Sequence, residues 1–470
     1  MHYHLIGICG TAMASLAGML QARGHKVTGS DQNVYPPMST QLEALGIEII
    51  NGYRAENADV GADFTIVGNT ISRGNSELEE VLNRKLVYRS QAEIVKEEFI
   101  RGKHSLVIAG THGKTTTTSI AAWIMEVGGL NPSFLVGGIV QNFDASFRIT
   151  GGNHFVIEGD EYDTAYFDKK PKFMHYLPET AIVGNIEFDH ADIYRDIHEI
   201  KFAFSRLMNL VPGNGCLIVG IDSPVVREVL EELDGKIFTN VETFGISEDA
   251  KWQAREIDFS GDTTRFTIFR EGQRWGAFET HLIGEFNVRN CLSVIIAANA
   301  WGITQEKMRE AFRSFKSVKR RVEVRGVERG VTVIDDFAHH PTAVEETLKA
   351  LKTKYRDKRL IAVFEPRSWS SRLAVFQEKY EKAFAYADYV IVAGVYNTSK
   401  ASELGKVLDT EELVKDVALT GKPAFSFPDA DTIVAHLAPE LREGDVVAIM
   451  SNGGFGGIHD KILNLLKNER

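Results

Sequence analysis

A glycine-rich segment near residue 110 has the residue types of a phosphate-binding loop. It follows an apolar run at residues 105–109, which predicts a buried strand, and precedes a segment with apolar residues at helical spacing. In that position glycines let backbone N–H groups turn onto phosphate, a lysine reaches the outer phosphates, and a threonine hydroxyl binds magnesium. The sequence therefore predicts a nucleotide site. The predicted loop consists of Gly110, Thr111, His112, Gly113, Lys114, Thr115 and Thr116.

Two acidic segments follow later strand-like runs and offer further chemistry. Residues 158–163 contain Glu161 among other carboxylates, and residues 185–190 end in His190. A hard cation on nucleotide phosphates prefers carboxylate oxygen and water, and an imidazole can complete a second metal site. An exposed acidic loop and a surface histidine are the open alternatives.

A third candidate is the turn at residues 7–13, between a strand-like run and a helix with an apolar face. The segment from Gly7 to Met13 superficially resembles a dinucleotide fingerprint, but the second and third glycine positions of that fingerprint hold Cys9 and Ala12. A nicotinamide-dependent oxidoreductase stays open as an alternative, and it would need a separate catalytic domain without a phosphate loop. Plain turn chemistry is the other open interpretation.

The spacing of glycines within the phosphate loop narrows the set of enzyme families that the chain could belong to. Its Gly-x-x-Gly-Lys-Thr pattern is shorter than the general nucleotide-binding pattern, and it resembles that of the Mur ligases and the related folylpolyglutamate synthases. Further segments are similar to Mur ligase motifs and occur in the expected order along the whole chain. They are residues 158–163, 185–190, 284–290 and 336–341.

The resemblance to the Mur ligases implies an ATP-dependent ligase that forms an amide bond through an acyl phosphate, with ATP and Mg²⁺ as cofactors. It implies three metal ligands, namely Thr115, Glu161 and His190. It implies four catalytic residues, namely Lys114, Glu161, His190 and His339. It implies further ATP contacts from Asn287, Asn290, Arg320, Arg321 and Asp336.

The same resemblance assigns the N-terminal turn to the diphosphate of a UDP-sugar. Asp31 ends the second predicted strand, at residues 26–31, where a carboxylate in such a fold meets the nucleoside. In this interpretation the N-terminal turn binds the UDP-sugar and the phosphate loop binds ATP, so each predicted nucleotide site has a ligand. The expected UDP-sugar-binding residues are Gly7, Gly10, Thr11 and Asp31.

Four segments are similar to the Mur ligases that attach a preformed murein tripeptide, namely residues 9–11, 35–39, 365–368 and 451–457. Arg367 and Ser368 are expected to bind the amine substrate, because a guanidinium can hold a carboxylate with two hydrogen bonds. The implied reaction joins L-Ala-γ-D-Glu-meso-diaminopimelate to UDP-N-acetylmuramic acid in peptidoglycan recycling. The alternative is a UDP-N-acetylmuramate–L-alanine ligase of de novo peptidoglycan synthesis, since the two kinds of ligase are similar over nearly their full length.

Strand-like and helical patterns alternate along the chain, which predicts an α/β protein. We expect a Rossmann-like UDP-sugar-binding domain at residues 1–100 and a central phosphate-loop ATPase domain with a mainly parallel sheet at 101–321. A Rossmann-like domain for the amine substrate is expected at 322–470. The charged residues 96–103 are expected to form a linker.

Composition excludes several other classes of protein. The chain has 470 residues and a formal net charge of −11, which argues against binding to nucleic acid or an anionic membrane. Its three cysteines are widely spaced, and no run of about 20 apolar residues or signal peptide is evident. We expect a cytoplasmic protein. A phosphate-loop switch protein that hydrolyses ATP slowly and forms no amide remains the second rival hypothesis.

Overall fold

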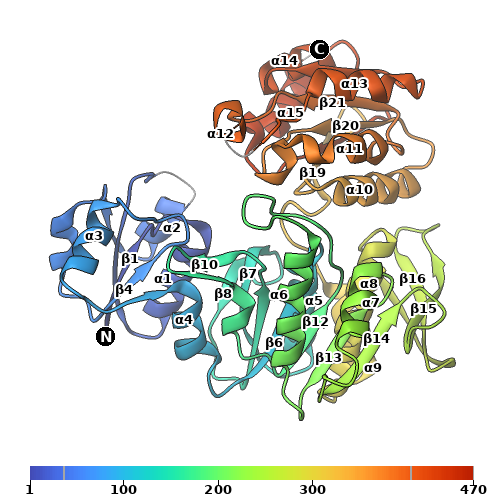
Figure 1. Cartoon of the computed structure of the whole chain (residues 1–470). Helices are drawn as coiled ribbons and strands as arrows, with labels where there is room; N and C mark the ends of the chain where they lie inside the picture. Colours follow the sequence, from blue (N-terminus) through green and yellow to red (C-terminus); the bar gives the residue numbers. More distant parts are fainter. Residues whose placement is uncertain (35–37, 403–404, 469–470) are drawn as a thin grey trace.

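The computed structural model describes residues 1–34, 38–402 and 405–468. These residues form three large sheets with flanking helices and one two-stranded sheet (Figure 1). The first is drawn in blue, the second in green to yellow, and the third in orange to red above them. The α/β class is confirmed, whereas the boundaries after residues 100 and 321 stay predictions. Part of the segment 35–39, residues 35–37, lies outside the described residues.

The N-terminal sheet is parallel and has the Rossmann-like order β3-β2-β1-β4-β5. Strand β1 ends at Ile6, because Gly7 turns the chain with a φ of 86°. Its strands are β1 (His2–Ile6), β2 (Lys26–Asp31), β3 (Glu48–Asn51), β4 (Phe64–Val67) and β5 (Tyr88–Ser90). Its helices are α1 (Thr11–Ala22), α2 (Met38–Ala44), α3 (Ser76–Asn83) and α4 (Gln91–Val95).

The segment expected as a linker is helical and packed. Helix α4 continues as a π-helical turn over Lys96–Ile100, and Phe99 and Ile100 are buried in an apolar core shared with the central sheet. Ser15 of α1 and Ser146 of β8 (Ala145–Arg148) are hydrogen-bonded across the same junction, at 3.1 Å between their Oγ atoms. Burial of these apolar side chains in a shared core therefore stabilises the contact between the N-terminal and central domains.

The central sheet has the order β17-β16-β15-β14-β13-β12-β6-β9-β7-β8. The stretch from β15 through β7 is parallel, as predicted, whereas β8, β16 and β17 pair antiparallel. Its strands are β6 (His104–Ala109), β7 (Ser133–Val140), β8, β9 (His154–Gly159), β12 (Thr180–Val183), β13 (Cys216–Gly220), β14 (Asn240–Gly245), β15 (Trp252–Asp258), β16 (Thr264–Arg270) and β17 (Gln273–Thr280). Its helices are α5 (Lys114–Val127), α6 (Ile197–Leu210), α7 (Pro224–Glu232), α8 (Glu285–Ala300) and α9 (Gln305–Ser314). The small sheet pairs β10 (Asp163–Ala165) with β11 (Asp168–Pro171).

The C-terminal sheet has the order β18-β19-β23-β20-β21-β22 and is parallel except at the edge strand β18. Its strands are β18 (Glu323–Glu328), β19 (Val331–Asp336), β20 (Leu360–Phe364), β21 (Tyr389–Ala393), β22 (Ala424–Phe427) and β23 (Val446–Met450). Its helices are α10 (Pro341–Lys354), α11 (Gln377–Ala383), α12 (Thr398–Ser402), α13 (Thr410–Leu419), α14 (Ala430–Leu437) and α15 (Ile458–Asn468).

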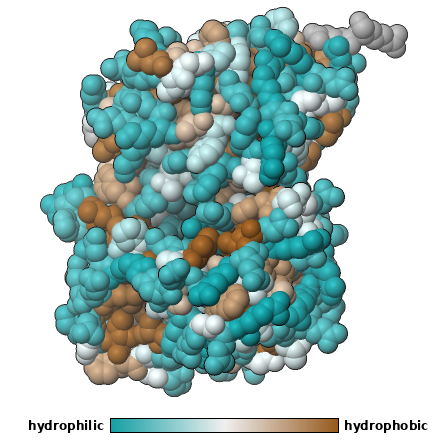
Figure 2. Space-filling model, turned by 90° about the vertical axis from the view of Figure 1, so that its right-hand side faces the viewer, coloured by the Kyte–Doolittle hydropathy of each residue, from teal (hydrophilic) through white to brown (hydrophobic). Residues whose placement is uncertain are grey.

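The surface narrows to a waist between the C-terminal domain and the rest of the molecule (Figure 2). Loops that follow parallel strands meet at this waist, which is where open α/β sheets bind ligands. Within the described residues, no helix combines the length and the apolar character needed to cross a bilayer.

Candidate active site

The phosphate loop connects β6 to α5, as predicted. Gly110 and Gly113 have φ values of 142° and 84°, which residues with a Cβ rarely adopt. A Cβ on Gly113 would lie 2.7 Å from Oδ1 of Asn290, so the close approach of α8 also requires glycine there. The Nζ of Lys114 donates to the carbonyl of Gly110 at 2.7 Å and so lies over the loop.

Lys114, Glu161 and His190, which the sequence places far apart, meet in the structure. Lys114 Nζ donates to Glu161 Oε2 at 2.7 Å, and His190 Nε2 lies 3.0 Å from Glu161 Oε1. Burial opposes the charge on all three groups, but the attraction of Glu161 to each cation, helped by the nearby Asp160 and Asp189, outweighs it. The pKa of Lys114 is raised, that of Glu161 is lowered, and that of His190 is raised to about 9. The cluster is therefore ionised at neutral pH.

Thr115 bridges a carboxylate and a guanidinium. Its Oγ1 donates to Glu158 Oε2 at 3.1 Å and accepts from Arg321 Nη2 at 3.2 Å. Burial raises the pKa of Glu158, whose other oxygen accepts from the backbone N–H of Gly137 at 2.6 Å. Glu158 was not among the predicted site residues, although it begins the acidic segment after β9. Together with Glu161, the Thr115 hydroxyl and the Glu158 carboxylate form a set of hard oxygen donors that fits Mg²⁺.

The two adjacent arginines at the domain boundary face different partners. Arg321 faces the phosphate loop through Thr115, and burial lowers the pKa of its guanidinium. Arg320 Nη2 donates to the carbonyls of Ser451 and Gly453, each at 2.7 Å, inside the C-terminal domain. The geometry therefore supports an ATP contact for Arg321 and a domain-internal role for Arg320.

The two asparagines of α8 lie against the phosphate loop. Asn290 Nδ2 donates to Asn287 Oδ1 at 3.1 Å, and Asn287 Nδ2 donates to the carbonyl of Ile283 at 2.8 Å. These bonds fix both amides on one face of the helix. Asn287, Asn290 and Thr116 all line the cavity described below.

Asp336 ends β19, and His339 lies in the short loop between β19 and α10. The Asp336 carboxylate accepts from the N–H groups of Val322 and Ala338 at 2.7 and 2.8 Å, and burial raises its pKa. It therefore holds the domain boundary in place, whatever it adds to nucleotide binding. His339 Nδ1 lies 3.0 Å from the carbonyl of Phe337, and burial lowers its pKa, so this imidazole is neutral at neutral pH.

A cavity of about 1720 Å³ joins these groups across all three domains. It runs from Thr11 of α1, past the phosphate loop, to Asp336 and His339 of the C-terminal domain. A nucleotide and a second bulky substrate can therefore share this one solvent-accessible cavity, whose volume exceeds that of ordinary small-molecule sites.

Three family models together match most of the chain. They are the Mur ligase family catalytic domain at residues 2–101, the Mur ligase middle domain at 108–298, and the Mur ligase glutamate ligase domain at 320–453. The chain belongs to the Mur ligase family. This Mur ligase is accordingly a carbon–nitrogen ligase of an ATP-dependent family.

Several relatives are similar to this Mur ligase over nearly its whole length. UDP-N-acetylmuramate–L-alanyl-γ-D-glutamyl-meso-2,6-diaminoheptandioate ligase of Escherichia coli K12 is 39% identical over 465 residues, covering 99% of this chain and 98% of the relative. UDP-N-acetylmuramate–L-alanine ligase of Salinibacter ruber is 34% identical over 469 residues, covering 99% and 95%. The crystal structure of a murein peptide ligase from Psychrobacter arcticus 273-4 superposes with a TM-score of 0.73 at 34% identity, covering 100% and 99%.

The N-terminal turn of this Mur ligase is held together by Asp31. Its carboxylate accepts from the N–H groups of Cys9 and Asn33, each at 2.9 Å, and Tyr53 donates its hydroxyl at 3.4 Å. The backbone N–H of Gly7 donates to the carbonyl of Ser30 at 2.8 Å. Asp31 therefore orders the turn, and its contact with a UDP-sugar stays a prediction, as do those of Gly7, Gly10 and Thr11.

The two third-domain segments that suggested a tripeptide lie together in this Mur ligase. The Arg367 guanidinium stacks over the ring of Tyr396 at 3.9 Å, and its Nη1 lies 3.4 Å from Glu365 Oε1. A Cβ on Gly453 would lie 2.1 Å from Arg367 Nε, so only glycine allows this approach. Ser368 caps the following turn, where its Oγ accepts from the N–H of Ser371 at 3.1 Å. Neither Arg367 nor Ser368 belongs to the described lining of the large cavity.

The domains also meet at residues that sequence reasoning left out. Thr342 Oγ1 of α10 donates to Glu187 Oε2 at 2.6 Å, and His340 Nε2 lies 3.1 Å from the carbonyl of Phe188. Glu187 and His340 stood inside segments similar to family motifs, next to the residues that we selected. Their contact joins positions more than 150 residues apart, which local sequence patterns do not indicate.

Proposed function

We propose that this Mur ligase joins L-Ala-γ-D-Glu-meso-diaminopimelate to UDP-N-acetylmuramic acid, using ATP and Mg²⁺, in peptidoglycan recycling. The observation that carries the proposal is the 39% identity over 99% of the chain to the Escherichia coli ligase whose name states that substrate pair. The Haemophilus influenzae ligase of the same name is also 39% identical, over 471 residues. The UDP-N-acetylmuramate–L-alanine ligases compared with it are 31–34% identical.

In the first step, a carboxylate oxygen of the lactyl group attacks the γ-phosphorus of ATP, and the bond from that phosphorus to the ADP oxygen breaks. ADP and an acyl phosphate result. Lys114 and Arg321 bring two cationic groups to the phosphate loop, where they offset negative charge on the transferred group. Asn287 and Asn290 complete the nucleotide wall of the cavity.

Mg²⁺ bound with ATP would supply charge neutralisation on the phosphates. Thr115, Glu158 and Glu161 would hold it, and His190 orients Glu161 through a contact of 3.0 Å. His190 as a direct second ligand stays the prediction made from the sequence.

In the second step, the amine nitrogen of the tripeptide attacks the acyl carbon, the carbon–oxygen bond to phosphate breaks, and the amine loses a proton. His339 lines the cavity and is neutral, so it can accept that proton. Contacts between Glu187 and Thr342 close the C-terminal domain over the phosphate loop and limit hydrolysis of the acyl phosphate by water. We assign one tripeptide carboxylate to Arg367.

The net charge of −11 does not favour nucleic acid or an anionic membrane surface. Cys9, Cys216 and Cys291 are all free thiols, which fits a reducing cytoplasm as the place of action.

Phosphate release from ATP tests the proposal. We expect release only when UDP-N-acetylmuramic acid and the tripeptide are both present, together with one new amide product per phosphate. NADH turnover would support the oxidoreductase alternative, and phosphate release without any amide product would support a phosphate-loop switch. Either result would contradict the proposal. Efficient use of free L-alanine would instead support the second candidate, an L-alanine ligase, which the 34% identity to the Salinibacter ruber enzyme favours.

A further inference from the structure

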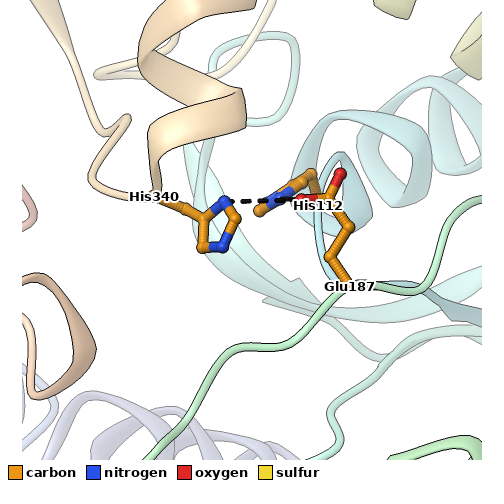
Figure 3. A group of neighbouring side chains, drawn as sticks. All are labelled: His112, Glu187 and His340. Atoms are coloured by element: carbon orange, nitrogen blue, oxygen red, sulfur yellow. Dashed lines mark ion pairs between the residues drawn. The ribbon is translucent and has the colours of Figure 1, made fainter. Parts of the chain in front are cut away.

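Two histidines and a glutamate from three separate segments point toward one another beside the phosphate loop (Figure 3). His112 belongs to the loop, Glu187 follows β12, and His340 precedes α10 in the C-terminal domain. Nε2 of His112 and Nδ1 of His340 each lie 3.7 Å from Oε2 of Glu187. One ligand atom of each residue lies within 4.8 Å of those of the other two.

Hydrogen bonding determines which nitrogen of His340 faces this cluster. Its Nε2 lies 3.1 Å from the carbonyl of Phe188, which can only accept, so Nε2 carries the proton. Burial lowers the pKa of His340 to about 3, so Nδ1 keeps its lone pair and accepts only a long bond of 3.3 Å from the N–H of Thr342. Metal-binding histidines are commonly held this way, with the second N–H on a carbonyl.

His112 and Glu187 have the other features of a ligand set. Nε2 of His112 is buried and makes no hydrogen bond within the described part of the chain, which is unusual for a buried polar atom. The backbone N–H of Glu187 donates to Thr111 Oγ1 at 2.8 Å, which holds the residue in place. Burial would raise the pKa of Glu187, but His112 and Thr342 outweigh it and lower the pKa to about 2, so the carboxylate is ionised.

We propose that His112, Glu187 and His340 bind a divalent transition-metal ion of the zinc class between the phosphate loop and the C-terminal domain. Zn²⁺ binds imidazole nitrogen and carboxylate oxygen at about 2.0–2.2 Å, so tetrahedral ligand atoms stand roughly 3.3 Å apart. The two distances of 3.7 Å are close to that spacing. All three residues line the large cavity, from which water can complete the coordination.

This site differs from the one expected for Mg²⁺ in its ligand atoms and in its effect on the position of the C-terminal domain. Two nitrogens and one carboxylate favour Zn²⁺ over Mg²⁺, which prefers oxygen ligands. Because His112 and His340 come from different domains, one shared ion ties the C-terminal domain to the phosphate loop. An ion here would therefore hold the enzyme closed, independently of which amine it uses.

Zn²⁺ itself is the probe for the test. The full-length chain is stripped with EDTA and titrated with Zn²⁺ against a chromophoric chelator, in excess Mg²⁺ so that oxygen-rich sites are filled. The wild type should show a saturable Zn²⁺ site. His340→Asn and Glu187→Gln should each weaken it at least about tenfold, and asparagine preserves the N-cap of α10. His198→Asn, at an exposed histidine of α6, is the matched control and should leave binding unchanged.

Co²⁺ gives a second measurement, because its visible d–d absorption reports the coordinating atoms. We expect bands typical of tetrahedral coordination in the wild type and in His198→Asn, and their loss in both ligand variants. Zn²⁺ binding equal to wild type in either folded variant would overturn the proposal. If neither variant folds, the wild type decides, since the absence of a saturable Zn²⁺ site or of tetrahedral Co²⁺ bands would overturn it too. The three residues would then form an interdomain polar contact only.

Discussion

Arg321 Nη2 lies 3.2 Å from Thr115 Oγ1, although 206 residues separate them in the sequence. This hydrogen bond brings the boundary of the C-terminal domain to the first turn of α5. The same hydroxyl donates to Glu158, so one threonine links a cation, an anion and the phosphate loop. The boundary of the C-terminal domain and the candidate nucleotide site are therefore in contact through a single side chain.

The adjacent arginines offer a matched pair for mutation. Arg321→Ala should lower kcat/KM for ATP by about 10²–10³-fold, the scale for removing one preorganised electrostatic donor. Arg320→Ala should mainly lower the free energy of unfolding, by about 1–3 kcal/mol, because it loses charged hydrogen bonds to Ser451 and Gly453. Steady-state kinetics and urea unfolding of both variants check this. A loss of activity in Arg320→Ala with a loss of stability in Arg321→Ala would contradict this assignment of the two arginines.

Lys114→Ala should lower turnover by at least about 10²–10³-fold, because in the proposed mechanism this lysine offsets charge on the transferred phosphoryl group. Circular dichroism should show an intact fold. Lys236→Ala, at an exposed lysine, is the control and should turn over like the wild type. Wild-type turnover in a folded Lys114→Ala variant would contradict a role for this loop in catalysis.

Glu161→Gln should raise the Mg²⁺ concentration needed for half-maximal activity while leaving affinity for the UDP-sugar nearly unchanged. The carboxylate loses one charged oxygen for a hard cation, and its ion pair with Lys114 disappears as well. A magnesium titration of the rate, with UDP-sugar affinity measured separately, checks both expectations. An unchanged titration would argue against Glu161 as a ligand.

Arg367→Ala should weaken use of the tripeptide by about 2–5 kcal/mol in transition-state free energy, the scale for truncating one partner of a buried charge pair. Affinity for the UDP-sugar should not change, because Arg367 lies in the C-terminal domain. Arg356→Ala, at an exposed arginine of that domain outside the cavity lining, is the control. Equal tripeptide kinetics in the Arg367→Ala and Arg356→Ala variants would contradict a substrate contact for Arg367 and leave it only its observed contacts with Glu365 and Tyr396.

Local sequence patterns were sufficient for the elements that build the nucleotide site. The strand before residue 110, the glycine-rich turn and the helix after it follow from short-range rules, and the structure has them where predicted. The antiparallel strands β16 and β17 were not predicted, and neither was the π-helical turn at Lys96–Ile100.

The sequence could not separate Arg320 from Arg321. In the structure Arg320 and Val322 have φ values of 63° and 51°, and this left-handed backbone turns neighbouring side chains toward different domains. Glu158, Glu187 and His340 were missed for a related reason. Their roles depend on contacts with distant segments, and a motif identifies a loop without showing which of its side chains points inward.

A competition between two amines tests the central claim most directly. The enzyme is given ATP, Mg²⁺, UDP-N-acetylmuramic acid, and equal concentrations of free L-alanine and L-Ala-γ-D-Glu-meso-diaminopimelate, and the products are identified by mass spectrometry. We expect the UDP-N-acetylmuramyl tripeptide as the main product, with ADP and phosphate formed in equal amounts. A product that is mainly UDP-N-acetylmuramyl-L-alanine would contradict the proposed substrate, and would make this Mur ligase an L-alanine ligase.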